Sequence, residues 1–125
     1  MTRLLPALAL VLVAAGATAA DSKKDLDKAL AGRVAGTPTD CIDHSFAEGP
    51  QIIDERTILY RSGRHVYRND TGGGCERIAS GDILLTQSIS GRLCRGDIGR
   101  TVSPSPRFQT GSCSLGSFVT YRRPK

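Results

Sequence analysis

The stretch Asp54–Asp70, DERTILYRSGRHVYRND, decides the fold class of this chain. Two runs rich in β-branched and aromatic residues flank Ser62-Gly63, and this pattern is typical of a β-hairpin with a two-residue turn. An isolated pair of strands is not stable in water, so the hairpin must pack on more sheet. The stretch therefore predicts a β domain built around this hairpin.

A two-residue turn at Ser62-Gly63 predicts the register of the hairpin. Arg61 would lie opposite Arg64, and Tyr60 opposite His65, which would then be a half-buried packing residue. Because successive side chains alternate between the faces of a strand, one face would carry Ile58, Tyr60, His65 and Tyr67, and the other Thr57, Leu59, Arg61, Arg64, Val66 and Arg68.

The rest of the chain after residue 40 predicts more short strands. They are expected at 41–46, 51–54, 82–89, 92–98 and 112–121, with a second hairpin turn at Ser90-Gly91 that sets Cys94 on the same face as Ile83, Leu85 and Ile98. Turn residues recur about every ten positions, which is typical of all-β domains. We expect an antiparallel all-β fold, a small barrel or sandwich of about six to seven strands.

The first nineteen residues have the pattern of a signal peptide. Arg3 precedes an apolar run at 4–15, and Ala17-Thr18-Ala19 is an A-x-A cleavage site. We expect cleavage before Ala20 and a periplasmic or secreted protein with no transmembrane span in its mature form. Of the 17 basic residues, 16 then remain against 12 acidic ones, a net charge of +4.

A short helix and a linker are expected at 20–40, before the β domain at 41–125. Ser22 and Asp25 have the spacing of a capping box, Leu26 and Leu30 lie one turn apart, and Gly32 can end the helix. The apolar stripe is narrow. The sequence leaves two alternatives open, a helix that lies on the sheet and one that frays.

Four cysteines in an exported chain of this size predict two disulfides. Cys41 and Cys75 lie at the edges of predicted elements, whereas Cys94 and Cys113 lie within predicted strands. Of the three possible pairings, this context favours Cys41 with Cys75 and Cys94 with Cys113. No C-x-x-C pair is present, so neither a zinc site nor a thioredoxin-type redox centre is expected.

Few residues are candidates for catalysis. A small secreted hydrolase would need His44, which follows Asp43, or a pair of carboxylates drawn from Asp54, Glu55 and Asp97. Neighbouring residues on a strand point to opposite faces, which opposes an Asp43–His44 pair, and aspartates at strand ends usually cap turns. We therefore predict no catalytic residue, no metal and no cofactor, with the hydrolase as the alternative.

Arginine is the dominant basic residue of the predicted β domain. After Lys28 the only lysine is Lys125, whereas eleven arginines follow residue 40. Genomic base composition alone can produce this bias, but arginine also suits carboxylate and phosphate groups. We predict a binding or structural module, with Arg61, Arg64 and Arg68 at the hairpin tip as a candidate anion site.

The partner of that site would be an anionic envelope polymer, a lipid or an acidic protein. Nucleic acid is a poor candidate for an exported chain that lacks a platform of stacking aromatic residues. No sequence pattern specifies an oligomeric state. Arginines that converge on one face would favour the binding module, and a concave site holding His44 or two carboxylates would favour the hydrolase.

Several short segments resemble one known family in their order along the chain. They are LAGRVAG at 30–36 leading to Cys41, IDERTILY at 53–60, Cys75, LCRGD at 93–97 and CSLGSF at 113–118. This order resembles a family of small exported proteobacterial proteins of unknown function, over nearly the whole mature chain. The resemblance implies a secreted β domain that bears cysteines, and it brings no activity, cofactor or catalytic residue.

Overall fold

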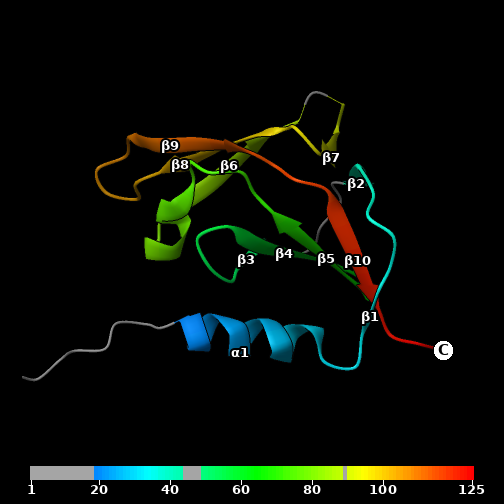
Figure 1. The fold of residues 1–125 in the computed structure, drawn as a ribbon. Coiled ribbons are helices and arrows are strands. Elements are labelled where there is room, and N and C mark those ends of the chain that lie inside the picture. Colours follow the sequence, from blue (N-terminus) through cyan, green and yellow to red (C-terminus); the bar gives the residue numbers. More distant parts are fainter. Residues whose placement is uncertain (1–18, 44–48, 89) are drawn as a thin grey trace, which may run out of the picture.

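The structure, a computed structural model, describes residues 19–43, 49–88 and 90–125. Within these ranges the protein is mostly β, with strands in three antiparallel sheets and one short N-terminal helix, as expected (Figure 1). The elements are α1 (Ala19–Leu30), β1 (Val34–Ala35), β2 (Cys41–Asp43), β3 (Gln51–Ile52), β4 (Thr57–Ser62), β5 (His65–Asp70), η1 (Glu76–Ser80), β6 (Ile83–Gln87), β7 (Arg92–Cys94), β8 (Ile98–Val102), β9 (Gln109–Ser114) and β10 (Phe118–Arg122).

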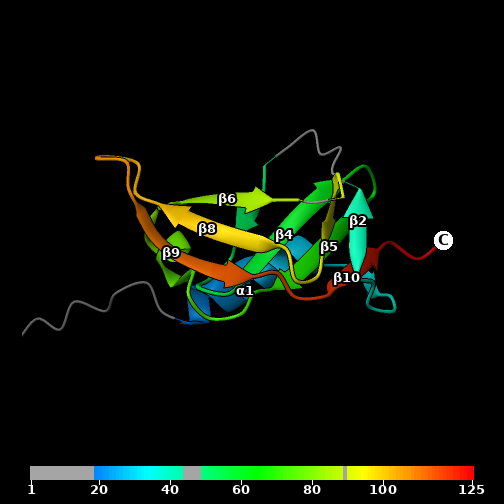
Figure 2. The same ribbon diagram turned by 90° about the horizontal axis from the view of Figure 1, so that it is seen from above.

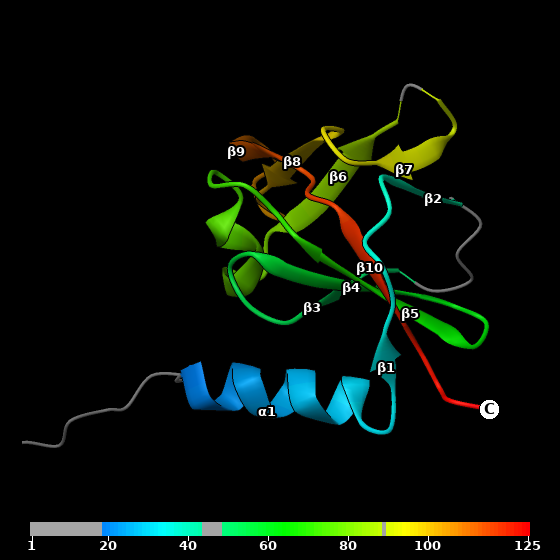
Figure 3. The same ribbon diagram turned by 45° about the vertical axis from the view of Figure 1, so that its right-hand side comes forward.

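The elements form layers. A five-stranded sheet in the order β1-β10-β5-β4-β3 lies between α1 on one side and the three-stranded sheet β6-β8-β9 on the other (Figure 1). The strands of the two sheets run in different directions when seen from above (Figure 2). The pair β2-β7 lies beside the small sheet (Figure 3). The sheets do not close on themselves, so the barrel alternative is not confirmed, and the described residues contain more strands than the six to seven expected.

The central hairpin is buried on both of its faces. One face contributes to a core with η1, β7 and β10, formed by Ile42, Ile58, Tyr60, Ile78, Leu93, Leu115 and Phe118. The other face supplies Leu59 and Val66, which pack with Ile53 against Leu26 and Leu30 of α1. Of the two alternatives for the helix, the structure therefore has the one in which it lies on the sheet.

The hairpin turn lies one position further along the chain than predicted. Ser62 pairs with His65 and Tyr60 with Tyr67, so the turn residues are Gly63 and Arg64. The φ angle of Gly63 is 57°, and a turn with its glycine in the first central position is of the II′ class. His65 is half-buried as expected, but its ring lies near Tyr67, with 6.0 Å between centroids, rather than opposite Tyr60.

The predicted second hairpin is wrong. β6 pairs with β8, and β7 pairs instead with β2, so Ser90-Gly91 does not join two partners of one sheet. The predicted strand 112–121 is also divided, because Leu115–Ser117 separates β9 from β10 and the two strands belong to different sheets. β6 and β7 therefore each pair with another strand, and the hairpin predicted from the Ser90-Gly91 turn does not form.

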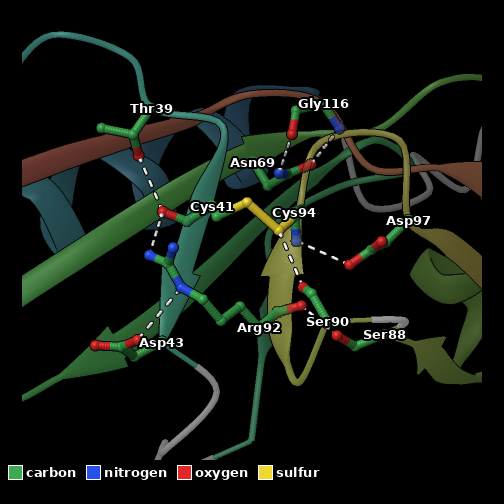
Figure 4. The surroundings of a disulfide bond; sticks show 10 residues. All are labelled: Thr39, Cys41, Asp43, Asn69, Ser88, Ser90, Arg92, Cys94, Asp97 and Gly116. Atoms are coloured by element: carbon green, nitrogen blue, oxygen red, sulfur yellow. Dashed lines mark hydrogen bonds and ion pairs between the residues drawn. A yellow bond between two sulfur atoms is a disulfide. The ribbon is translucent and has the colours of Figure 1, made fainter.

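Both disulfides form, but with different partners from those predicted. Cys41 is bonded to Cys94 and Cys75 to Cys113, with Cα–Cα distances of 4.0 and 5.5 Å. Cys41 and Cys94 lie directly opposite each other in the β2-β7 ladder (Figure 4). The pairing Cys41–Cys75 was wrong because strand partners, not the position of a cysteine within its own strand, decide which sulfurs meet. The two bonds indicate an oxidising compartment.

Candidate anion-binding site

A pocket of about 340 Å³ lies between the C-terminal half of α1 and the end of the central hairpin. We call it the basic pocket. It is lined by Asp25, Lys28, Ala29, Ala31, Arg33, Gln51, Arg61 and Arg123. Four of these side chains are cationic and one is a carboxylate, and they come from the helix, the segment after it, β3, β4 and the C-terminal tail.

The local structure explains how two of the arginines reach the pocket. Gly32, with a φ of 71°, follows the helix and turns the chain so that Arg33 meets the hairpin. Arg33 Nη1 donates to the carbonyl oxygen of Arg64 at 2.6 Å. Arg61 lies on the face of β4 that also carries Leu59, which is the face that α1 covers, and its Nη2 donates to Gln51 Oε1 at 3.1 Å.

The four cations of the basic pocket outnumber its one carboxylate, Asp25, and none of them forms an ion pair within the described residues. Across the described ranges, the ion pairs join Arg56 to Glu76, Arg68 to Asp70, Arg77 to Asp82 and Arg92 to Asp43, and none involves Lys28, Arg33, Arg61 or Arg123. The hydrogen-bond acceptors of Arg33 and Arg61 are a carbonyl and an amide oxygen, which orient a guanidinium without cancelling its charge. Asp25 contributes one negative charge and the C-terminus of α1 about half of one, so the four cations leave the pocket with a positive charge.

The structure separates the three arginines predicted to act together. Arg61 lines the basic pocket, whereas Arg64 is an exposed turn residue whose carbonyl accepts from Arg33. Arg68 Nε lies 3.2 Å from Asp70 Oδ2. Burial would lower the pKa of Arg68, but the hydrogen bond and charge of Asp70 raise it above its ordinary value. Its charge is thus already compensated.

Sequence reasoning missed the other three cations. Lys28 and Arg33 lie near the end of α1 and Arg123 lies in the C-terminal tail, all distant in sequence from Arg61, and each looks like an ordinary surface residue. The one available signal was Gly32 at the helix end, which turns the chain beside Arg33. Which strand that turn would meet depends on long-range packing of α1.

Two of the candidate carboxylates, Asp54 and Asp97, accept hydrogen bonds from backbone amides. Asp54 Oδ1 accepts from the amides of Arg56 and Thr57 at 2.9 and 2.7 Å. Partial burial raises the pKa of Asp54, but these hydrogen bonds outweigh it and leave the pKa below its ordinary value. Asp97 Oδ2 accepts from the amide of Cys94 at 2.8 Å (Figure 4), and Glu55 is exposed. His44 lies outside the described residues. Asp54 and Asp97 therefore cap two different turns.

A second, larger cleft of about 940 Å³ lies beside the N-terminal half of α1. Its charged lining residues have both signs, namely Lys23, Arg56 and Arg68 with Asp21, Asp25, Asp54 and Glu55. Both of its arginines, Arg56 and Arg68, are already in ion pairs. This cleft is therefore less suited to an anion than the basic pocket.

Within the described ranges, no group of three or more metal-ligating side chains is found, and no helix is long and apolar enough to cross a membrane. Comparison with protein-family models, with curated proteins and with solved structures finds no match to this chain.

Proposed function

We propose that this protein is an exported binding module whose basic pocket holds an anionic group of an envelope polymer, a lipid or an acidic protein. The observation that carries the proposal is the set of four cations, Lys28, Arg33, Arg61 and Arg123, which line one pocket with a single carboxylate, Asp25. None of the four forms an ion pair within the described part of the chain. The proposal replaces the hairpin-tip group Arg61, Arg64 and Arg68 with this set.

The chemistry of the pocket favours a phosphate or a carboxylate. A guanidinium presents parallel N–H donors that match two oxygens of either group. Arg33 and Arg61 are already oriented by neutral acceptors, so less side-chain freedom is lost when an anion binds. A pocket of about 340 Å³ suits one charged group and its immediate attachment rather than a long polymer segment.

Two features support an exported location. The segment 1–19 has the pattern of a cleaved signal peptide, and the two disulfides suit an oxidising compartment. A protein in that location meets phosphate-bearing and carboxylate-bearing envelope components. The resemblance to exported proteobacterial proteins of unknown function agrees with this location and adds no activity.

The test compares the double variant Arg33→Gln, Arg61→Gln with the control Arg100→Gln, Arg107→Gln, which removes the same charge from exposed positions outside the pocket. Binding of the mature protein to polyphosphate and to polyglutamate is measured by calorimetry at several salt concentrations. Loss of two charge-assisted contacts should weaken binding about tenfold or more in the pocket variant. The salt dependence should also become shallower, because fewer charges are screened.

The control variant should bind within about twofold of the parent, since it changes only the overall charge. Equal weakening in both variants would mean that the protein attracts anions through its net charge and not through the pocket, and the proposal would fail. Circular dichroism of each variant checks that the fold is retained.

A further inference from the structure

The outer edge of β6 is an unpartnered strand edge in the described part of the chain. In the small sheet β6 pairs only with β8, and no other described strand lies along its far side. The strand Ile83–Gln87 reads ILLTQ, with no charged residue, no proline and no glycine. Exposed edge strands usually carry charged residues or proline, because these residues prevent pairing with another chain.

The other sheet edges are protected. β1 and β3, at the ends of the large sheet, are two residues long, and the strands of the β2-β7 pair are three residues long. Very short edge strands offer little to pair with. β9, at the opposite end of the small sheet, is covered by the segment that leads to η1. There the Gly72 amide donates to the Ser114 carbonyl at 2.9 Å, and the Cys75–Cys113 disulfide holds the segment in place. The absence of such protection on β6 distinguishes this edge.

The outward face of β6 is also apolar. Leu85 is 54% exposed and Ile83 is 38% exposed, and the neighbouring strand adds Ile98 at 43%. Alternation along the strands places these side chains on one face, because Ile83 pairs with Val102 and Gln87 pairs with Ile98. An uncharged edge therefore continues into an exposed apolar surface.

We infer that β6 is an interface for a second copy of this chain, and that the two β6 strands pair antiparallel about Leu85. The strand is complementary to itself in this register. Leu85 would face Leu85 of the second copy, Ile83 would face Gln87, and Leu84 would face Thr86. Every cross-strand pair is uncharged, and the two small sheets would join into one continuous sheet.

The charges of the two copies permit this arrangement. On the outward face the residue of β8 opposite Leu85 is the charged Arg100. In the joined sheet the two Arg100 residues would be three strand spacings apart, about 14 Å, which exceeds the screening length of about 8 Å at physiological salt. Each mature chain also carries a net positive charge, so added salt should strengthen self-association, whereas it weakens binding of an anion.

The test is sedimentation equilibrium of the parent, Leu85→Lys and Phe108→Lys. Phe108→Lys is the control. Phe108 is 54% exposed, as Leu85 is, and it lies outside β6, so this variant adds the same charge at an equally exposed position away from the proposed interface. Five ladder residues per copy form an interface below the standard size, so the dimer should be weak and concentrations from about 1 µM to 1 mM are needed.

The parent and the Phe108→Lys variant should approach twice the monomer mass as concentration rises. Leu85→Lys should raise the dissociation constant about tenfold or more, because two lysines would face each other across the ladder. A parent that remains monomeric over the whole range, or a Leu85→Lys variant that associates as strongly as the parent, would overturn the inference.

Hydrogen exchange separates edge pairing from other modes of association. Amides of β6 that face the outer edge should gain protection as concentration rises, while amides of β9 should not. Concentration-dependent association without added protection in β6 would also overturn the inference.

Discussion

Asn69 illustrates how a single buried side chain holds the segment that connects two sheets. It is fully buried on β5, its Nδ2 donates to the Gly116 carbonyl at 2.8 Å, and its Oδ1 accepts from the Gly116 amide at 2.9 Å (Figure 4). Gly116 lies between β9 and β10, where the chain leaves the small sheet for the large one. No alanine side chain could make either bond, so two backbone groups would lose their partner.

Replacement of Asn69 with alanine should lower the free energy of unfolding by about 3 kcal/mol, since each unsatisfied buried group costs about 1–3 kcal/mol. Urea denaturation measures the change. The exposed Gln87→Ala serves as the control, and it should stay within about 0.5 kcal/mol of the parent. A loss below about 1 kcal/mol for Asn69→Ala would show that water replaces the amide.

The hydrogen bonds of Asp82 should make the stability of the fold depend on pH. Its Oδ2 accepts from Thr110 Oγ1 at 2.6 Å and from Arg77 Nε at 3.0 Å. The hydrogen bond from Thr110, followed by that from Arg77, lowers the pKa of Asp82 below its ordinary value of 3.8. The stabilisation is complete above that ordinary value and is lost as the pH falls toward the folded-state pKa.

Urea midpoints of the parent and of Asp82→Asn, measured from neutral pH down to acid, test this assignment. The difference between the two proteins should shrink as the pH falls below 3.8, because the parent then becomes protonated at this position. A constant difference over that range would contradict the role given to the Asp82 carboxylate.

Among the elements, the central hairpin shows what local sequence can and cannot determine. The turn lies one position later than predicted, which changes the partner of each strand residue by two positions. The side chains of both strands therefore lie on their predicted faces, and Arg64 is in the turn instead. The strand 82–89 also formed in large part, but its partner β8 lies beyond β7. Local patterns predict a strand and its faces, whereas the choice of partner depends on packing between distant segments.

The strand pairing of β2 with β7 predicts the disulfide connectivity. Non-reducing peptide mapping should link Cys41 to Cys94 and Cys75 to Cys113. The bonds span 53 and 38 residues, so each should stabilise the fold by about 4 kcal/mol on the chain-entropy model. Reduction should therefore lower the melting temperature. A peptide that links Cys41 to Cys75 would contradict the strand pairing of β2 with β7.

Across the whole molecule, the sequence was sufficient to predict the β class, the N-terminal helix and the presence of two disulfides. These features depend on periodicity and cysteine count, which are local or compositional. The predicted capping box at Ser22 and Asp25 is wrong, because α1 already includes Ala19 and both residues lie inside the helix. The basic pocket could not be predicted, because Lys28, Arg33, Arg61 and Arg123 come together only when α1 and the C-terminal tail lie on the hairpin. Of the predicted anion site, Arg61 alone lies in that pocket.

The most direct test of the basic pocket as the anion-binding site is an NMR titration of the mature, isotopically labelled protein with pyrophosphate. The largest chemical-shift changes should occur at the Nε–H groups of Arg33 and Arg61 and at the side-chain amide of Gln51, which line the pocket. The changes at Arg64 and Arg68 should be smaller. Equal changes at all exposed arginines, or changes centred on Arg68, would contradict the claim that the basic pocket is the anion-binding site.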